Sequence, residues 1–170
     1  MHTTGKTVVI NGGGSGIGRE LAQRLDALGN SVIGTGRRLP PLQETIAGRT
    51  QMHAFELDID DPAAIAQFAK QVLAQFPSTN VLINNAGIMR TEDLSHASSL
   101  QDAEAHITTN LLGTIRMTNA FVEQLKQQAN AAVLTVSSGL AFVPLVSAPI
   151  YSATKAAIHS YSQSLRQQLA

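Results

Sequence analysis

The sequence contains no cysteine and no tryptophan, and aromatic residues make up only 4% of its 170 residues. The lack of cysteine excludes a disulfide framework, a cysteine-ligated zinc and a cysteine nucleophile. Scarce aromatic side chains argue against a stacking platform for single-stranded nucleic acid. A charge bias is also missing, because 12 basic residues balance 12 acidic ones. A neutral chain without a basic run is a poor candidate for binding nucleic acid or an anionic membrane.

Long hydrophobic runs are absent as well. The apolar run at residues 8–10 is far too short for a signal sequence or a membrane span, and the stretch 139–150 is interrupted by Pro144 and Pro149. Apolar residues still make up 44% of the chain, which argues against disorder. We therefore expect one soluble, cytoplasmic domain. No metal site is expected, because the five histidines show no ligand spacing.

Short apolar runs alternate with segments of helical periodicity along the chain. Strands are expected at residues 7–10, 31–34, 51–57, 81–83 and 132–136, and helices at residues 17–28, 62–76, 102–128 and 150–169 and around Glu44. This alternation predicts an α/β fold, a doubly wound parallel sheet of the Rossmann type with strand order 3-2-1-4-5. Such sheets bind ligands beyond the carboxyl ends of their strands.

A glycine-rich turn follows the first strand and opens the first helix. It reads Asn11-Gly12-Gly13-Gly14-Ser15-Gly16-Ile17-Gly18. Glycines permit a tight turn and let the backbone approach a pyrophosphate, and the helix N-terminus stabilises that anion. It is not a Walker phosphate loop, because no Gly-Lys-Ser/Thr follows. The turn predicts a dinucleotide site. If the turn is considered alone, the alternative is a glycine-rich turn that binds no ligand.

The end of the second strand lacks the acidic residue that would accept the ribose 2′-hydroxyl of NAD. Residues 34–38 read Gly-Thr-Gly-Arg-Arg, with no carboxylate between Asp26 and Glu44. Two arginines can instead hold the 2′-phosphate of NADP through charge-assisted hydrogen bonds. Arg37 and Arg38 therefore predict a preference for NADP(H) over NAD(H); the alternative is a solvated surface pair.

Tyr151 and Lys155 are four residues apart, so they share one face of a helix. A free tyrosine has a pKa of about 10, and a nearby ammonium lowers that pKa by favouring the phenolate. Such a pair is common by chance. However, Ser138 follows the fifth strand, residues 84–87 end the fourth and Asp58 ends the third. All of these lie at the edge of the predicted sheet that carries the glycine turn.

Together these motifs resemble the short-chain dehydrogenase/reductase family over essentially the whole chain. The residues that carry the resemblance are the glycine turn, Asn84-Asn85-Ala86-Gly87, Asn110, Ser138, Tyr151 and Lys155. Residues 80–90 and 137–142 also resemble a bacterial subgroup associated with D-alanylation genes. The resemblance implies hydride transfer between NADP(H) and a small-molecule carbonyl or secondary alcohol.

The resemblance also implies a role for each site residue. Tyr151 is the general acid/base, Lys155 lowers the pKa of Tyr151 and binds the nicotinamide ribose, and Ser138 polarises the substrate oxygen. Asn110 holds a water in a proton relay through Lys155. The implied cofactor contacts are Gly12, Ser15, Gly16, Ile17 and Gly18 at the pyrophosphate, Asp58 and Ile59 beside the adenine, and Asn85, Ala86 and Gly87 near the adenosine.

The sequence departs from the family pattern at several points. Asn11 stands where threonine is usual, and we expect it to hydrogen-bond locally. The family's sixth strand, the Pro-Gly loop after it and the last strand are missing, so residues 132–136 are expected to form an exposed apolar edge. Residues 1–170 are therefore interpreted as a dinucleotide-binding domain, the N-terminal part of a longer single-domain enzyme.

Two other functions are weighed against the oxidoreductase. A chain that truly ends at residue 170 lacks one wall of the pocket, which favours a non-catalytic cofactor-binding or assembly module. Epimerases and dehydratases of the related extended family also use a Tyr/Lys pair, but they carry a large substrate domain.

The resemblance to the short-chain dehydrogenase/reductase family implies a homodimer or homotetramer through helices 102–128 and 150–169. The apolar positions suited to that contact, which could equally face the sheet, are Leu111, Ile115, Phe121, Ala156 and Tyr161.

Overall fold

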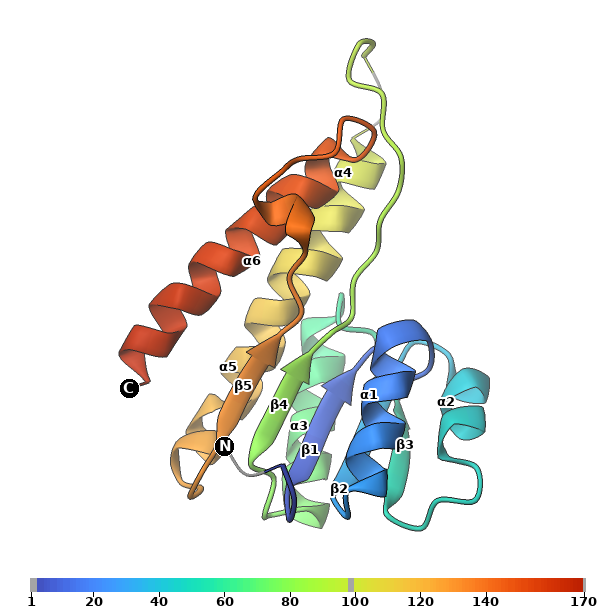
Figure 1. Cartoon of the computed structure of the whole chain (residues 1–170), viewed down its shortest axis with the longest axis vertical. Coiled ribbons are helices and arrows are strands. Elements are labelled where there is room, and N and C mark those ends of the chain that lie inside the picture. Colours follow the sequence, from blue (N-terminus) through green and yellow to red (C-terminus); the bar gives the residue numbers. More distant parts are fainter. Residues whose placement is uncertain (1–2, 98–99, 170) are drawn as a thin grey trace.

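Five parallel strands form a single sheet in the order β3-β2-β1-β4-β5 (Figure 1). The structure is a computed structural model that describes residues 3–97 and 100–169. The strands are β1 (Thr7–Asn11), β2 (Ser31–Gly36), β3 (Met52–Glu56), β4 (Val81–Asn84) and β5 (Ala132–Thr135). The predicted fold class and strand order are confirmed.

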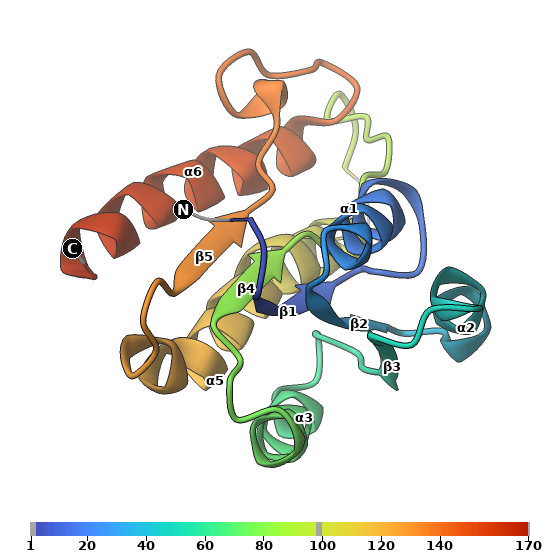
Figure 2. The same cartoon turned by 60° about the horizontal axis from the view of Figure 1, so that its bottom comes forward.

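Helices connect the strands and cover both faces of the sheet (Figure 2). They are α1 (Gly16–Ala27), α2 (Leu39–Ile46), α3 (Pro62–Gln75), α4 (Gln101–His106), α5 (Thr114–Lys126) and α6 (Pro149–Gln168), with a 3₁₀ turn η2 (Gly139–Ala141). In Figure 2, α1 and α6 lie above the sheet, and α3 and α5 lie below it. Within the described ranges, no helix combines the length and the apolar character that crossing a membrane requires.

The helix predicted over residues 102–128 is not uniform. Between α4 and α5 the chain forms a π-helix, η1 (Ile107–Gly113), and Asn110 lies at its centre. Short π segments inside α-helices are rare and occur frequently at functional sites. The apolar pattern of such a segment still looks helical, so the periodicity alone predicts one continuous α-helix.

Two apolar clusters hold the sheet between its helices. Below the sheet, Val9 of β1 packs with Phe68 of α3 and Phe121 of α5, whose ring centroids lie 6.0 Å apart. Above it, Val8 packs with Ala22 of α1. Successive strand residues point to opposite faces, and both faces are covered, which explains the continuously apolar strands. Phe121 is fully buried, so it is a core residue and does not contribute to an oligomer surface.

Candidate active site

The glycine turn joins β1 to α1 at the carboxyl edge of the sheet. Gly12 has a φ of +71°, and a β-carbon there would lie 2.8 Å from Asn85 Nδ2. At Gly18, a β-carbon would lie 2.1 Å from the Gly12 carbonyl oxygen. On the other side of the turn, Gly16 and Ile17 are exposed, and a β-carbon at Gly16 would meet no atom within 4 Å. The turn is thus closely packed toward the protein and open toward solvent.

The N-terminus of α1 is built to accept an anion. Its N-cap, Ser15, makes no side-chain capping bond, and its first turn holds no acidic residue. The first N–H groups of a helix have no acceptor within that helix, and its dipole favours negative charge there. The residues present therefore fit the pyrophosphate of a dinucleotide.

A cavity of about 280 Å³ lies between this turn and the ends of β2, β3 and β4. The residues predicted from the sequence that line it are Gly12, Ser15, Arg37, Arg38, Ile59, Asn85, Ala86 and Gly87. Gly16, Ile17, Gly18 and Asp58 are sequence neighbours of that lining without forming part of it. Thr35, Ile88 and Thr109 also line it and carry no signal in the sequence. Within the described ranges, the buried Thr35 Oγ1 has no hydrogen-bond partner.

Arg37 and Arg38 are exposed side chains on the cavity wall where β2 ends. Neither guanidinium forms an ion pair with another residue of the described chain. Glu44 is a nearby carboxylate in the sequence, but it pairs with Arg19 at 3.2 Å. The positive charge of both arginines therefore remains available to an anionic ligand.

Tyr151 and Lys155 lie one helical turn apart near the start of α6. Lys155 Nζ lies 5.7 Å from the centroid of the Tyr151 ring and donates to the Val136 carbonyl oxygen at 2.8 Å. Lys155 is only 5% exposed, and this burial lowers the pKa of its ammonium below the ordinary value of 10.5. A carbonyl at the end of β5 thus holds a buried cation beside the phenol.

The two serines after β5 make different contacts. Ser137 Oγ donates to the Lys155 carbonyl oxygen at 3.3 Å, which fastens this segment to α6. Ser138 Oγ accepts from the Leu140 N–H at 3.1 Å. Since its oxygen is the acceptor there, the Ser138 hydroxyl keeps its hydrogen for donation to another group. This difference favours Ser138 over Ser137 as the residue that contacts a substrate oxygen.

Asn110 is 1% exposed, and its side chain joins three parts of the fold. Its Oδ1 accepts from the Ile88 N–H at 2.8 Å, and its Nδ2 donates to the Ile88 carbonyl oxygen at 2.9 Å and to Thr154 Oγ1 at 3.1 Å. A β-carbon at Gly87 would lie 3.3 Å from Asn110 Oδ1 and 3.6 Å from Lys155 Nζ. Asn110, Lys155 and the segment after β4 therefore meet at one point.

Asn11 makes contacts well beyond the local ones expected of it. Its Oδ1 accepts from the N–H groups of Asn85 at 2.8 Å and Ala86 at 2.6 Å, and its Nδ2 donates to Asn84 Oδ1 at 2.9 Å. These bonds tie the end of β1 to the end of β4. The expectation of local bonding is wrong because β1 and β4 are neighbours only in the folded sheet.

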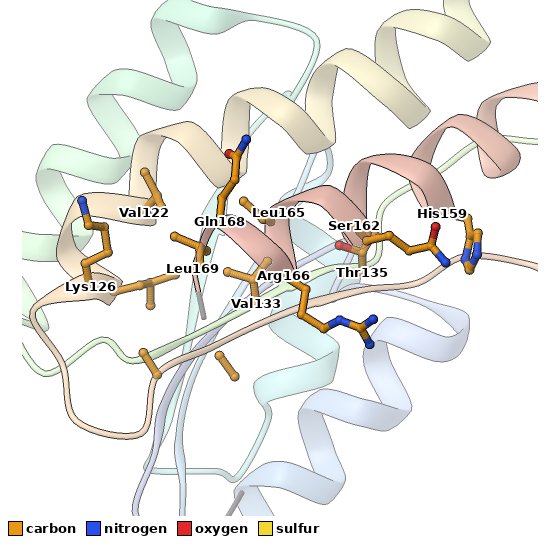
Figure 3. Close-up of a pocket in the computed structure, with 14 residues that line it drawn as sticks. Val122, Lys126, Val133, Thr135, His159, Ser162, Leu165, Arg166, Gln168 and Leu169 are labelled. Carbon is orange, nitrogen blue, oxygen red and sulfur yellow. The ribbon is translucent and has the colours of Figure 1, made fainter.

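A larger cavity of about 880 Å³ lies between α5, β5 and α6 (Figure 3). Val122, Val133, Leu165 and Leu169 are among its apolar lining residues, and none of the predicted site residues lines it. The cavity lies along β5, the last strand of the sheet, and Leu134 of the same strand is 40% exposed without lining the cavity. The predicted apolar edge is therefore present, and it is separate from the candidate active site.

Comparison with known proteins identifies the family. The family model for the short chain dehydrogenases matches residues 6–170. The chain belongs to the short-chain dehydrogenase family. The chain is 39% identical over 170 residues to the uncharacterized oxidoreductase DltE of Bacillus subtilis. This match covers 99% of the chain and 68% of DltE.

Two further comparisons concern the cofactor. Over 164 residues the chain is 32% identical to the NADP-dependent 3-hydroxy acid dehydrogenase YdfG of Salmonella typhimurium, covering 95% of this chain and 66% of that protein. The solved 3-ketoacyl-(acyl-carrier-protein) reductase of Brucella melitensis, complexed with NADH, superposes with a TM-score of 0.92 at 26% identity, covering 99% of this chain and 72% of that one. Of these two similar proteins, one is named as NADP-dependent and the other was solved with NADH bound. The chain spans about two thirds of the length of the curated relatives it matches.

Proposed function

We propose that this protein is an NADP(H)-dependent oxidoreductase that acts on a carbonyl or secondary-alcohol substrate. The main support is the buried Lys155 ammonium held against the Tyr151 ring, close to Gly87, which lines the cavity at the glycine turn. A buried cation stabilises a neighbouring phenolate more strongly than a solvated one, because the local dielectric constant is low.

Each residue of the site has a defined task in this reaction. Tyr151 gives its proton to the carbonyl oxygen in reduction and takes it from the alcohol in oxidation. Ser138 donates a hydrogen bond to the same oxygen, and Lys155 with Asn110 completes a proton path through a water. The nicotinamide, when bound, supplies or accepts the hydride. The protein contributes placement, proton transfer and electrostatic stabilisation.

The cofactor would lie along the carboxyl edge of the sheet. Gly12, Ser15, Gly16, Ile17 and Gly18, with the N-terminus of α1, would hold the pyrophosphate. The adenosine would lie between residues 58–59 and residues 85–87. Arg37 and Arg38 would take the 2′-phosphate, which an NAD molecule does not carry.

Tyr151→Phe tests the acid/base assignment. Loss of a general acid lowers turnover by about 10²- to 10⁴-fold, so we expect a kcat reduced by that factor with NADPH binding retained. Tyr161→Phe is the matched control, because Tyr161 lies on the same helix and has no proposed part in the chemistry. A 3-hydroxy acid is the first substrate class to assay, given the name of one relative. Full turnover of Tyr151→Phe would refute the mechanism.

Titration with NADPH and NADH tests the cofactor assignment. A charge-assisted hydrogen bond contributes about 1.5–3 kcal/mol, so we expect NADPH to bind about 10- to 100-fold more tightly than NADH. Arg37→Ala and Arg38→Ala should each reduce this ratio, whereas Arg24→Ala should not, because Arg24 pairs with Glu20 on the exposed side of α1. NADH binding as tight as NADPH binding would overturn the assignment.

We also infer a homo-oligomer formed through α4, η1, α5 and α6. Support comes from Ile107 and Leu112 of η1, which are 43% and 38% exposed, together with the exposed Ala156 of α6. Apolar side chains in such positions are suited to helix packing across a two-fold axis. Size-exclusion chromatography with light scattering should give a dimeric or tetrameric mass, and a monomeric mass would refute this.

A further inference from the structure

The buried carboxylate of Glu92 has no part in the proposed chemistry, yet it lies against the first turn of α6. Glu92 belongs to the segment between β4 and α4, and its side chain is 8% exposed. Its Oε2 accepts from the Ile150 N–H at 3.0 Å, and its own N–H donates to the Ser147 carbonyl oxygen at 3.0 Å. Glu92 thus holds both the helix and the loop leading into it, immediately before Tyr151.

The first turn of α6 supplies no capping group of its own. Its N-cap, Ala148, makes no side-chain capping bond, Pro149 follows it, and no acidic residue lies in the first turn. The first N–H groups of a helix need an acceptor from outside the helix, and Ser, Thr, Asp or Asn at the N-cap usually provides it. Here the acceptor is Glu92, 58 residues away from Ile150 in the sequence.

His106 lies behind this carboxylate and is completely buried. Its Nε2 accepts from the Arg90 N–H at 3.0 Å, so the hydrogen of the neutral ring is on Nδ1. Nδ1 lies 2.8 Å from the Asp102 carbonyl oxygen and 3.4 Å from Glu92 Oε1. Within the described ranges, Oε1 is buried and has no hydrogen-bond partner, and His106 Nδ1, whose N–H bonds the Asp102 carbonyl oxygen, lies in ion-pair range of it.

The cluster extends to one further pair. The Arg90 guanidinium bonds the Asp102 carboxylate, which joins the segment after β4 to α4. Arg90, Glu92, Asp102 and His106 do not line the cavity beside the glycine turn. The cluster therefore contacts the start of α6 without lining the cavity at the glycine turn.

We propose that Glu92, supported by His106, is a positioning residue that fixes the first turn of α6 and thereby the Tyr151 hydroxyl. This inference rests on the proposed acid/base role of Tyr151. Reacting groups must be held closely, since a displacement of 1 Å costs about 10²-fold in rate. Loss of the Glu92 contact should therefore reduce kcat and leave cofactor affinity intact.

Glu92→Ala and Glu92→Gln in the full-length protein separate positioning from folding. We expect Glu92→Ala to lower kcat by about 10²-fold, with KM and the Kd for NADPH within about twofold of wild type. Glu92→Gln should recover most of kcat, because its amide oxygen can still accept from the Ile150 N–H. The matched control is Glu104→Ala, which removes an exposed carboxylate from α4. A contribution to stability alone would change the melting temperature and leave kcat per folded molecule unchanged.

Hydrogen–deuterium exchange supplies a readout that does not depend on activity. The Ile150 amide should exchange faster in Glu92→Ala than in wild type and return toward the wild-type rate in Glu92→Gln. Unchanged exchange overturns the inference whatever the activity, and so does a wild-type kcat in Glu92→Ala. If Glu92→Ala does not fold, His106→Phe keeps a buried ring and removes the nitrogen that lies 3.4 Å from Oε1. A wild-type kcat in that variant also overturns the inference. Full turnover in Tyr151→Phe would refute the proposed function instead.

Discussion

Gly18 is the position in the glycine turn that leaves the least room for a side chain. A β-carbon there would lie 2.1 Å from the Gly12 carbonyl oxygen and 2.5 Å from Asn85 Nδ2, whereas β-carbons do not approach other atoms closer than 3.0 Å. The nearest atom belongs to the backbone and cannot rotate away as a side chain can. Gly18→Ala therefore forces α1 and the turn apart by about 0.9 Å.

Two opposed effects act on the melting temperature of Gly18→Ala. Overpacking of this kind costs about 1–3 kcal/mol, and in a domain of this size each kcal/mol lowers the melting temperature by about 2–4 °C. We expect Gly18→Ala to melt about 2–12 °C below wild type. Helix propensity alone predicts the opposite sign, because alanine is favoured over glycine inside a helix by about 1 kcal/mol. The direction of the shift thus distinguishes the two effects.

Thermal unfolding followed by circular dichroism, together with an NADPH fluorescence titration, measures both consequences. NADPH should bind more weakly to Gly18→Ala, because the N–H groups at the start of α1 move away from the turn. Gly139→Ala is the thermal control, since a β-carbon at Gly139 meets no atom within 4 Å. An unchanged or higher melting temperature for Gly18→Ala would refute the idea that this close approach holds α1 in place.

Three further changes test other parts of the fold. Burial lowers the pKa of Lys155 in the folded state, so the unfolded state binds more protons and the free energy of unfolding rises with pH up to the ordinary pKa of 10.5. Lys155→Met should abolish that rise in urea unfolding, and an equal rise of the free energy with pH in the variant would contradict this. Asn11→Ala leaves the N–H groups of Asn85 and Ala86 without their acceptor and should cost about 2–4 kcal/mol by urea unfolding, with a loss below about 0.5 kcal/mol as the contrary result. Phe121→Ala should cost about 3–5 kcal/mol, and a loss under about 1 kcal/mol would show that Phe121 is not a core residue.

The elements of this fold were predictable because their signals are local. Apolar runs such as residues 7–10 and 81–83 mark strands buried on both faces, and the spacing of Tyr151 and Lys155 indicates one helix face. In a parallel sheet the carboxyl ends of the strands lie at one edge, so motifs that follow strands must gather there. The glycine turn, Arg37 and Arg38 were located in this way.

Contacts between distant segments were not predictable in the same way. The π-helix around Asn110 adds one residue per turn without breaking the apolar pattern. Asn11 bonds the end of β4, and Glu92 caps α6, although neither partner is near in sequence. The sequence did not show whether Phe121 faces the core or an oligomer surface. Its packing with α3 shows that it belongs to the core.

The sequence by itself determined the family, the order of elements and the residue types at the candidate site, because each rests on a short pattern of a few residues. The tertiary structure decided which side chains meet: the buried Lys155 against Tyr151, the Asn11 bridge between β1 and β4, and the Glu92 carboxylate on the first turn of α6. The physical reason is that burial and hydrogen bonding depend on distances between segments that the chain brings together only when it folds.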